Sequence, residues 1–434
     1  MFDLNPDFLT SMRALLEPSD YEAYLQALLE PPKRFARVNP QKRVPDDAIR
    51  SELGDFPFLP QDASPGKCPL HAAGAYYVQE PAAAAVASML PPLLPRGAAV
   101  LDMCAAPGGK VTGVASARPD CFFMANETVF SRTKPLLQNV ERLGLRNVTV
   151  TSLRPDAIAK QGARFDAVIA DVPCSGEGMM RKSSAAAEEW SEENVRACVN
   201  RAEKILDSCD AALKSGGILL FSTCTFNRAE NEEQVLRLMA RGYTPLMPAV
   251  RFPHAREGFG IPEAVRFFPQ DGGGEGHFAC LLQKTGKDTA HGKDTALPTS
   301  PKKKRVLELL KPITNESFDG TIIELGAGYE LLPPLYPFGV FPALRRGVRL
   351  CEESGSVLLP HHHFATAAKA DALIDSPDFS PADPQLSAYL RGEAIPLSAA
   401  RGFRILRVCG ITLGLVKVSD GIAKNHYPKG LRLL

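Results

Sequence analysis

The fold is decided by the stretch Val100-Leu101-Asp102-Met103-Cys104-Ala105-Ala106-Pro107-Gly108-Gly109-Lys110. Its first four residues are typical of the end of a buried strand, and the small residues after them open a helix. Small residues and paired glycines at a strand-to-helix turn let the backbone approach a nucleotide-like ligand closely. A GxGxxG motif is absent, because alanines stand at the first two small positions, and this disfavours a bound pyrophosphate.

Strands and helices alternate around this stretch, from residue 76 to residue 284. The expected strands are 98–103, 121–125, 148–151, 165–170, 218–222 and 277–283. The expected helices are 109–117, 131–143, 192–214 and 228–241. Strands that are apolar on both faces and separated by helices are typical of a parallel sheet with helices on both sides. We therefore predict an α/β fold with a doubly wound, mostly parallel sheet.

The length of 434 residues predicts about three domains. The expected divisions are a helical N-terminal domain at 1–75, the sheet domain at 76–284, a linker at 285–305, an intermediate module at 306–358 and a C-terminal mixed α+β module at 359–434. Residues 286–290 are nearly repeated at 292–296, and such a polar segment cannot bury a core. The basic run Lys302-Lys303-Lys304-Arg305 is interpreted as the solvated end of the linker, with an RNA-facing patch as the alternative.

Composition excludes several classes of protein. The chain has a net charge of +1, ten cysteines without a CxxC pair, and no apolar run approaching the roughly 20 residues that span a bilayer. No signal segment is apparent at its start, so we expect a soluble protein of the reducing cytosol, with no membrane partner. We expect no metal, because the adjacent histidines 361–363 lack partners at ligand spacing and are interpreted as a polar loop.

Two cysteines each follow a predicted strand. Cys174 lies in Asp171-Val172-Pro173-Cys174-Ser175-Gly176, and Cys224 lies in Ser222-Thr223-Cys224-Thr225-Phe226. Ligands of an open parallel sheet bind outside the carboxyl ends of its strands. One cysteine there would usually be explained by packing, but two at strand exits favour a shared active site.

An acidic residue follows the second strand at the spacing expected for a ribose contact. Glu127 stands 18 residues after Gly109, where a carboxylate can accept hydrogen bonds from ribose hydroxyls. The alternative is a surface glutamate. Asp156 is a candidate for the third wall of an adenosine pocket, although Pro155 makes its setting irregular. A ribose acid without a phosphate loop indicates S-adenosylmethionine as the cofactor.

Taken together, the motifs around Cys104, Cys174 and Cys224 resemble the Nop/Sun family of RNA 5-methylcytosine methyltransferases. The resemblance extends over most of the chain and is greatest to the bacterial RsmF group, which acts on small-subunit ribosomal RNA. Further matching segments are 37–39, 77–81, 230–232, 386–392 and 424–432. The chain departs from the family pattern at Ala82, Ala202 and Ser215.

The resemblance implies a role for each motif. Cys224 is implied to attack carbon 6 of cytosine, Cys174 to assist release of the product, and Asp171 to hydrogen-bond the base, with Lys110 orienting the substrate or Asp171. The implied cofactor-binding residues are Cys104, Ala105, Ala106, Pro107, Gly108, Gly109, Lys110, Glu127, Asp156 and Asp171. We also expect a helix to begin near Asn227 and to favour the Cys224 thiolate with its N-terminus.

The target base must leave its stack to reach two thiols in a crevice, which agrees with an RNA substrate. Candidate RNA contacts are Arg37, Arg181, Lys182 and Lys429, and the C-terminal module resembles a PUA-like RNA-binding fold. A solvated loop is the alternative for Arg181 and Lys182.

Two other functions stay open. A DNA cytosine methyltransferase would use Cys174 as its nucleophile, and a non-catalytic RNA-binding factor would use neither thiol. The sequence does not indicate the oligomeric state.

Overall fold

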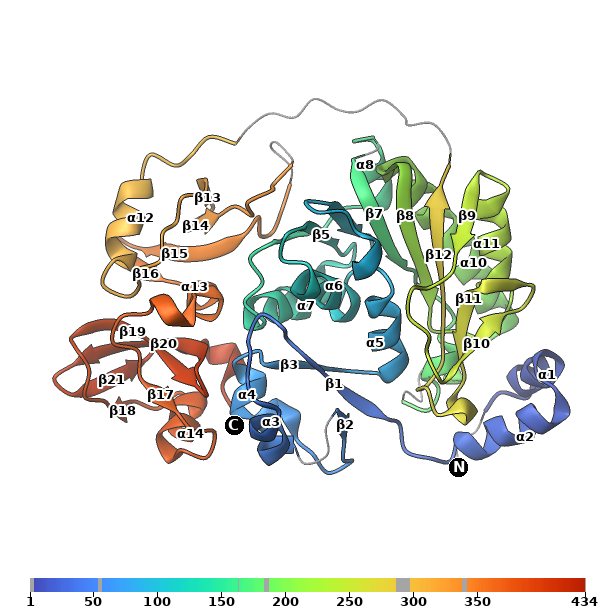
Figure 1. Cartoon of the computed structure of the whole chain (residues 1–434), viewed down its shortest axis with the longest axis horizontal. Coiled ribbons are helices and arrows are strands. Elements are labelled where there is room, and N and C mark those ends of the chain that lie inside the picture. Colours follow the sequence, from blue (N-terminus) through green and yellow to red (C-terminus); the bar gives the residue numbers. More distant parts are fainter. Residues whose placement is uncertain are drawn as a thin grey trace.

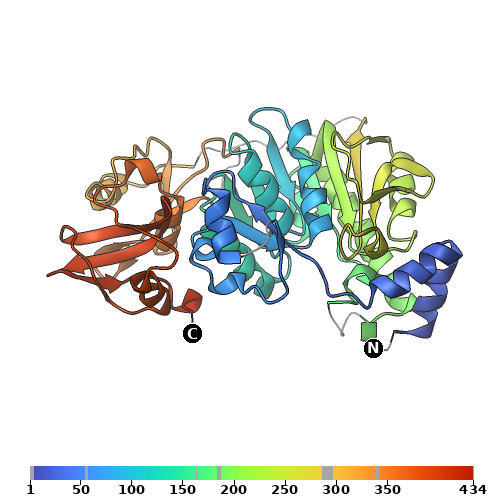
Figure 2. The ribbon, with the colours of Figure 1, turned by 60° about the horizontal axis from the view of Figure 1, so that its bottom comes forward.

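The computed structural model describes residues 4–53, 57–162, 164–182, 187–285, 297–337 and 342–433. The near-repeat at 286–296 lies outside the described residues. The central sheet stands between helices α1 and α2 at one end and two C-terminal sheets at the other (Figure 1), and the view in Figure 2 shows the same order. No helix among the described residues is long and apolar enough to cross a membrane.

The central sheet has the strand order β10-β11-β12-β8-β7-β4-β5-β6, and β9 also pairs with β12. Its strands are β4 (Ala99–Asp102), β5 (Phe122–Asn126), β6 (Val148–Thr151), β7 (Phe165–Asp171), β8 (Leu213–Thr223), β9 (Tyr243–Leu246), β10 (Ala255–Gly258), β11 (Ile261–Phe267) and β12 (His277–Lys284). The five strands from β8 to β6 are parallel, whereas β9 to β12 pair antiparallel. The predicted mostly parallel, doubly wound sheet is confirmed.

Helices cover both faces of this sheet. One face packs on α5 (Pro81–Ser88), α6 (Gly109–Ala117) and α7 (Phe130–Arg142), and the other on α8 (Pro155–Ala159), α10 (Glu192–Ala212) and α11 (Glu232–Met239). Val100 belongs to the first core and Leu101 to the second, and neither is exposed. Because successive side chains point to opposite faces, a strand buried on both sides must be apolar throughout.

The N-terminal region contains a small sheet as well as helices. Its elements are α1 (Pro6–Leu15), α2 (Pro18–Ala27), β1 (Arg34–Val38), α3 (Asp46–Leu53), β2 (Phe58–Leu59), α4 (Pro69–Ala72) and β3 (Tyr76–Gln79), with the order β2-β1-β3. Arg37, one of the candidate RNA contacts, therefore lies in strand β1. Helices α1 and α2 share a core with Trp190, Phe226 and Phe268, beside the segment that follows Cys224.

The C-terminal part holds two further sheets. The first has the order β13 (Ile322–Leu325), β14 (Gly328–Leu331), β15 (Val348–Ser354) and β16 (Val357–Pro360), and the second has the order β17 (Asp378–Phe379), β19 (Gly402–Val408), β20 (Ile411–Ser419), β21 (Ile422–Asn425) and β18 (Ile395–Pro396). Their helices are α12 (Lys303–Leu310), α13 (His362–Ala367) and α14 (Pro384–Arg391). Most of the basic run 302–305 thus lies in helix α12, not in a linker.

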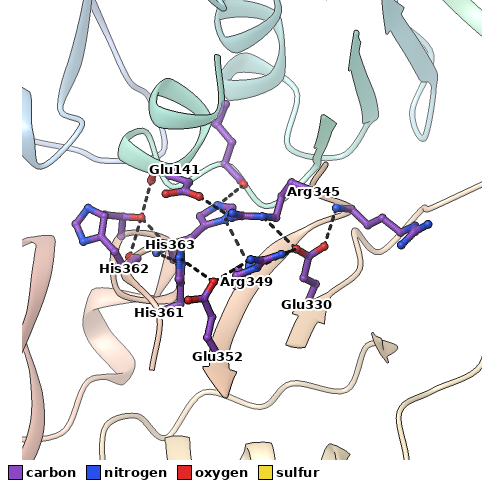
Figure 3. A network of polar contacts seen from close by, with 11 residues as sticks. Glu141, Glu330, Arg345, Arg349, Glu352, His361, His362 and His363 are labelled. Atoms are coloured by element: carbon purple, nitrogen blue, oxygen red, sulfur yellow. Dashed lines mark hydrogen bonds and ion pairs between the residues drawn. The ribbon is translucent and has the colours of Figure 1, made fainter. Parts of the chain in front are cut away.

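A buried polar network joins the first of these sheets to the central domain (Figure 3). The Arg345 guanidinium lies 2.6 Å from Glu141 of α7 and 3.1 Å from Glu330 of β14. It also lies 3.1 Å from Nδ1 of His363, and the Val150 N–H donates to the Arg345 carbonyl at 2.7 Å. The interpretation of 361–363 as a polar loop is wrong, because His362 and His363 begin α13 and are buried.

Candidate active site at the carboxyl ends of the parallel strands

The two cysteines meet at neighbouring strand ends. Strands β7 and β8 pair in parallel with Asp171 opposite Ser222, so the residues after them leave the sheet side by side. The Cys174 and Cys224 sulfurs lie 3.2 Å apart, and the Cys224 N–H donates to the Cys174 sulfur at 3.3 Å. The structure therefore brings the thiols into the shared position expected from the sequence.

A partly buried ion pair lies between the glycine-rich turn and the Cys174 loop. Lys110, in the first turn of α6, places Nζ 2.7 Å from Asp171 Oδ2, and the Ser222 hydroxyl donates to Asp171 Oδ1 at 2.8 Å. Burial acts to raise the pKa of Asp171, but Lys110 and His277 outweigh it and hold that pKa below its usual value. Burial likewise acts to lower the pKa of Lys110, and Asp171 reverses this. Both groups are therefore charged at neutral pH.

A second acid, Asp102, ends strand β4 at the base of the site. It is buried and accepts a hydrogen bond from the Cys104 N–H at 3.2 Å. Burial, followed by repulsion from Asp171, raises the pKa of Asp102 to about 8. Sequence reasoning did not select Asp102, although its place at the strand end just before the turn was a usable signal.

The two thiols are not equivalent. The hydrogen bond to Cys224, reinforced by burial, raises the pKa of Cys174. Cys174 is therefore protonated at neutral pH. Either sulfur can be the donor in the contact between the two thiols.

Buried carboxylates fix the loops that carry the thiols. Glu177 accepts hydrogen bonds from the N–H groups of Phe226 at 2.7 Å and Asn227 at 2.9 Å, and from Trp190 Nε1 at 3.0 Å. Glu230 accepts from the Ser175 N–H at 2.9 Å. Satisfied buried networks of this kind make a loop rigid, and this one holds both cysteine loops together.

The segment after Cys224 differs from the prediction. We expected a helix from Asn227, but α11 begins at Glu232, with Asn231 as its N-cap. Asn227 instead accepts a hydrogen bond from the Glu230 N–H at 2.9 Å within a series of turns. The helix N-terminus is thus eight residues from Cys224 along the chain, and a helix-dipole effect is confined to the first turn.

The glycine-rich turn and Glu127 fit a nucleoside-like ligand. Gly108 has φ +108°, and a Cβ there would lie 3.2 Å from Leu136 Cδ1. Glu127 is buried at the end of β5, and its Oε1 accepts from the Val129 N–H at 2.8 Å. Its Oε2 is buried, accepts no hydrogen bond and lies 3.6 Å from Arg132, so it can accept one from a ribose hydroxyl.

Asp156 stands apart from that cradle. It lies in the first turn of α8 with a half-exposed carboxylate, 2.9 Å from Arg154 and 3.8 Å from Lys160. These surface partners account for the side chain without a ligand. Its place in the adenosine pocket stays a prediction.

The four predicted RNA contacts lie in different settings. Arg37 donates to Gln79 at 2.6 Å, to the Gly109 carbonyl at 2.5 Å and to Thr112 at 2.8 Å, so its guanidinium ties β1 to α6. Arg181 is buried, 2.6 Å from Glu275, and donates to the Ala27 carbonyl. These two arginines are used within the protein, which favours a structural role for each.

Lys182 and Lys429 are exposed. Partial desolvation of the Lys182 ammonium lowers its pKa, and Glu275, Glu80 and Cys224 oppose that effect. Lys429 begins a 3-10 turn (Lys429–Leu431) at the C-terminal end of the chain. Both remain available to a phosphate. No group of three potential ligands that could hold a metal ion occurs in the part of the chain that the structure describes.

Comparison with known proteins shows which family this chain belongs to. Residues 92–283 match the model of 16S rRNA methyltransferase RsmB/F, residues 4–81 match the N-terminal domain of 16S rRNA methyltransferase RsmF, and residues 376–433 match the methyltransferase RsmF PUA domain. Ribosomal RNA small subunit methyltransferase F of Escherichia coli O157:H7 is 30% identical over 98% of this chain and 96% of its own length. The chain belongs to this family.

Other relatives agree with the assignment. Ribosomal RNA small subunit methyltransferase F of Shewanella loihica is 29% identical over 99% of this chain and 96% of its own length. The crystal structure of NSun6 from Pyrococcus horikoshii with SFG shares the fold, with a TM-score of 0.57 and 17% identity over 65% of this chain and 99% of that one. A methyltransferase homologue from the same organism gives a TM-score of 0.52 and 22% identity over 65% and 100%. The predicted methyltransferase fold and the PUA-like module are confirmed.

Proposed function

We propose that this protein methylates carbon 5 of a cytosine in 16S ribosomal RNA, using S-adenosylmethionine and a covalent bond between Cys224 and the base. The observation that carries the proposal is the 3.2 Å contact between Cys174 and Cys224 beside the Lys110–Asp171 ion pair. Membership of the small subunit methyltransferase F family supports the ribosomal substrate, which a cytoplasmic protein would meet. The PUA match supports RNA contact through the C-terminal module.

The cofactor is S-adenosylmethionine, whose sulfonium supplies an electrophilic methyl group. The turn from Cys104 to Gly109 and the Glu127 Oε2, which accepts no hydrogen bond, would hold its nucleoside part. Carbon 5 of cytosine is a poor nucleophile on its own. The protein must therefore activate the base before transfer, which is the purpose of covalent catalysis.

Cys224 is the attacking group. Its sulfur lies 3.2 Å from the Cys174 sulfur, so the Cys174 S–H can donate to Cys224 once Cys224 is ionised, and a hydrogen bond to the charged form favours a thiolate. The thiolate bonds carbon 6, and the electron pair of the 5,6 double bond becomes available at carbon 5 to accept the methyl group. The Asp171 carboxylate, held by Lys110, accepts hydrogen bonds from the cytosine edge and stabilises a proton on its ring nitrogen.

Cys174 becomes a base only after the attack. Its pKa is raised first by the hydrogen bond to Cys224, and this cause disappears when the Cys224 sulfur becomes a neutral thioether. Cys174 then loses its proton more easily, and its thiolate can take the carbon 5 proton. The electron pair of that C–H bond restores the double bond, and Cys224 leaves as thiolate.

The substrate is tested by bisulfite mapping of 16S ribosomal RNA from cells with and without the gene, and with the gene carrying Cys224→Ala. We expect at least one cytosine that is protected in the first strain and unprotected in the other two. Identical maps in all three strains would contradict the ribosomal assignment.

A further inference from the structure

His277 is a buried side chain at the active site that the mechanism above does not use. In the antiparallel pairing of β12 with β8, Phe278 lies opposite Thr223. The next position in the same register places His277 opposite Cys224. Side chains alternate along a strand, and Ala279 packs in the core formed with α5 and α6. His277 therefore points to the same face as Lys110 of α6.

The backbone around His277 is in close contact with both cysteine loops. A Cβ on the neighbouring Gly276, whose φ is +150°, would lie 2.4 Å from Phe226 Cζ and 3.0 Å from Gly178 Cα. Phe226 follows Cys224 by two residues, and Gly178 follows Cys174 by four. Only a glycine leaves room for the three segments to meet, so the start of β12 forms one wall of the site.

The carboxylate of Glu80 lies next to the His277 imidazole and is held in place by backbone N–H groups. Glu80 caps α5 by accepting from the N–H groups of Ala82 at 3.0 Å and Ala83 at 2.6 Å, and it also accepts from the Glu275 N–H at 2.9 Å. Its Oε2 lies 3.3 Å from His277 Nδ1, which is buried and makes no hydrogen bond in this arrangement. A small rotation of the ring would aim a protonated Nδ1 at Glu80 and leave Nε2 as the acceptor.

The other described candidates for a proton acceptor beside Cys224 are occupied. Asp171 accepts from Lys110 and Ser222, and the raised pKa of Cys174 keeps that thiol protonated at neutral pH. The helix N-terminus that could have served Cys224 begins only at Glu232. A nucleophile, a base and a carboxylate that orients the base form a recurrent arrangement for activating a thiol.

We propose that His277, oriented by Glu80, accepts the proton of the Cys224 thiol. The Cys224 S–H bond breaks, its electron pair stays on sulfur, and the proton bonds to Nε2 of His277. The imidazolium faces Glu80 at the start of α5 and Asp171 at the end of β7, which stabilise it, and Lys110 of α6 and Lys182 after the Cys174 loop, which oppose it. The inference deepens the proposed function, because it requires Cys224 to be the nucleophile.

Electrostatics agrees with an imidazole that is free to accept. Burial lowers the pKa of His277, Glu80 and Asp171 raise it, and Lys110 and Lys182 lower it, with a net decrease. The ring is therefore neutral at pH 7 and carries a lone pair.

The test is the rate at which iodoacetamide alkylates Cys224 in the full-length protein without RNA or cofactor, with His277→Gln and His277→Asn compared with wild type. Tryptic peptides 215–228 and 165–181 each contain one cysteine, so mass spectrometry follows Cys224 and Cys174 separately. The control is His254→Gln, an exposed histidine outside the site. Positioned acid–base groups typically contribute roughly 10²-fold or more, so we expect Cys224 alkylation at pH 7 to slow at least about tenfold.

The same loss should disappear above about pH 9, where thiols ionise without help. Two results would overturn the inference. One is an unchanged rate at pH 7 in both variants. The other is an equal loss at every pH, which would mean that His277 only supports the fold. Methylation of RNA is not measured, so a failure of the ribosomal assignment would leave this result unaffected.

Discussion

Removing the charge of Lys110 should reverse the way in which stability depends on pH. In Lys110→Met, the Asp171 carboxylate loses the ammonium that lies 2.7 Å away and keeps the burial that acts to raise its pKa. Breaking a buried pair from one side costs about 3–5 kcal/mol when the remaining charge is uncompensated. Asp171 is about a third exposed and keeps the hydrogen bond from Ser222, so we expect a smaller loss of about 1–2 kcal/mol at pH 7.5.

The direction of the pH dependence follows from the direction in which the pKa of Asp171 is shifted in each protein. In wild type the pKa of Asp171 is depressed, so its contribution is present above the ordinary carboxyl pKa and is lost as the pH falls towards the depressed value. In the variant the pKa is raised, so the penalty is present at neutral pH and is relieved as protonation of Asp171 removes the charge. The difference in stability between the two proteins should therefore shrink as the pH falls from 7.5 to 5.

The assay is urea unfolding followed by near-ultraviolet circular dichroism at pH 7.5, 6 and 5. Lys110→Arg keeps a positive charge and serves as the control, and Asp171→Asn in the Lys110→Met background removes the stranded charge. The double variant should be more stable than Lys110→Met at pH 7.5. A loss that is independent of pH, or a double variant no more stable than the single one, would refute the reasoning.

Three more predictions concern cofactor binding by Glu127, the close contact of Gly276 with Phe226, and the Arg345 network that joins the C-terminal part to the central domain. Glu127→Gln should weaken S-adenosylmethionine binding by roughly 10-fold to 100-fold in calorimetry, since a hydrogen bond to a charged group contributes about 1.5–3 kcal/mol. The control Asp156→Asn should change the affinity less than about threefold. Equal effects of the two substitutions would contradict the placement of Glu127 at the ribose. Gly276→Ala should lower kcat at least about tenfold, because its Cβ would lie 2.4 Å from Phe226. The control is Gly66→Ala, where an added Cβ would meet no atom within 4 Å. Arg345→Met should cost about 3 kcal/mol, because Glu141 loses the guanidinium that lies 2.6 Å away, whereas Glu330 keeps Arg349 at 2.9 Å. The same change should speed proteolysis between the central and C-terminal domains, and unchanged proteolysis would mean that the network in Figure 3 does not hold them together.

Local patterns carried the prediction of the central fold and of the thiol pair. The strands around Val100 and Ile169 are buried on both faces, so their apolar runs were direct evidence of a covered parallel sheet. Parallel strands expose their carboxyl ends at one edge, so the positions after Asp171 and Ser222 had to be neighbours once β7 and β8 paired. Lys110 could be selected for a similar reason, because it directly follows the glycine-rich turn at that edge of the sheet.

The setting of a polar residue could not be predicted where long-range contacts decide it. Arg37 and Arg181 suggested RNA contacts from their charge, yet each donates to partners far along the chain, such as the Gly109 carbonyl and Glu275. Nothing in the local sequence distinguishes such an arginine from a solvated one. His363 is similar, since its burial depends on the docking of Arg345 and on the Leu145 carbonyl.

Two residues near the thiols were not selected from the sequence, because their positions depend on contacts between segments that are far apart along the chain. His277 looked like the first residue of an ordinary strand, and only the antiparallel register with β8 places it beside Cys224. Glu177 follows the Cys174 motif directly and has no distinguishing local pattern, and its hydrogen bonds to Phe226 and Asn227 form only where the two cysteine loops meet. The same contacts replace the helix that was expected from Asn227.

The central claim is that Cys224 attacks the base and Cys174 releases it, and covalent capture of RNA tests it most directly. Purified wild type, Cys224→Ala and Cys174→Ala are incubated with 16S ribosomal RNA and S-adenosylmethionine, and denaturing gels record the RNA–protein adduct. We predict no adduct for Cys224→Ala and an adduct that accumulates for Cys174→Ala. An adduct with Cys224→Ala but not with Cys174→Ala would reverse the assignment and contradict the account.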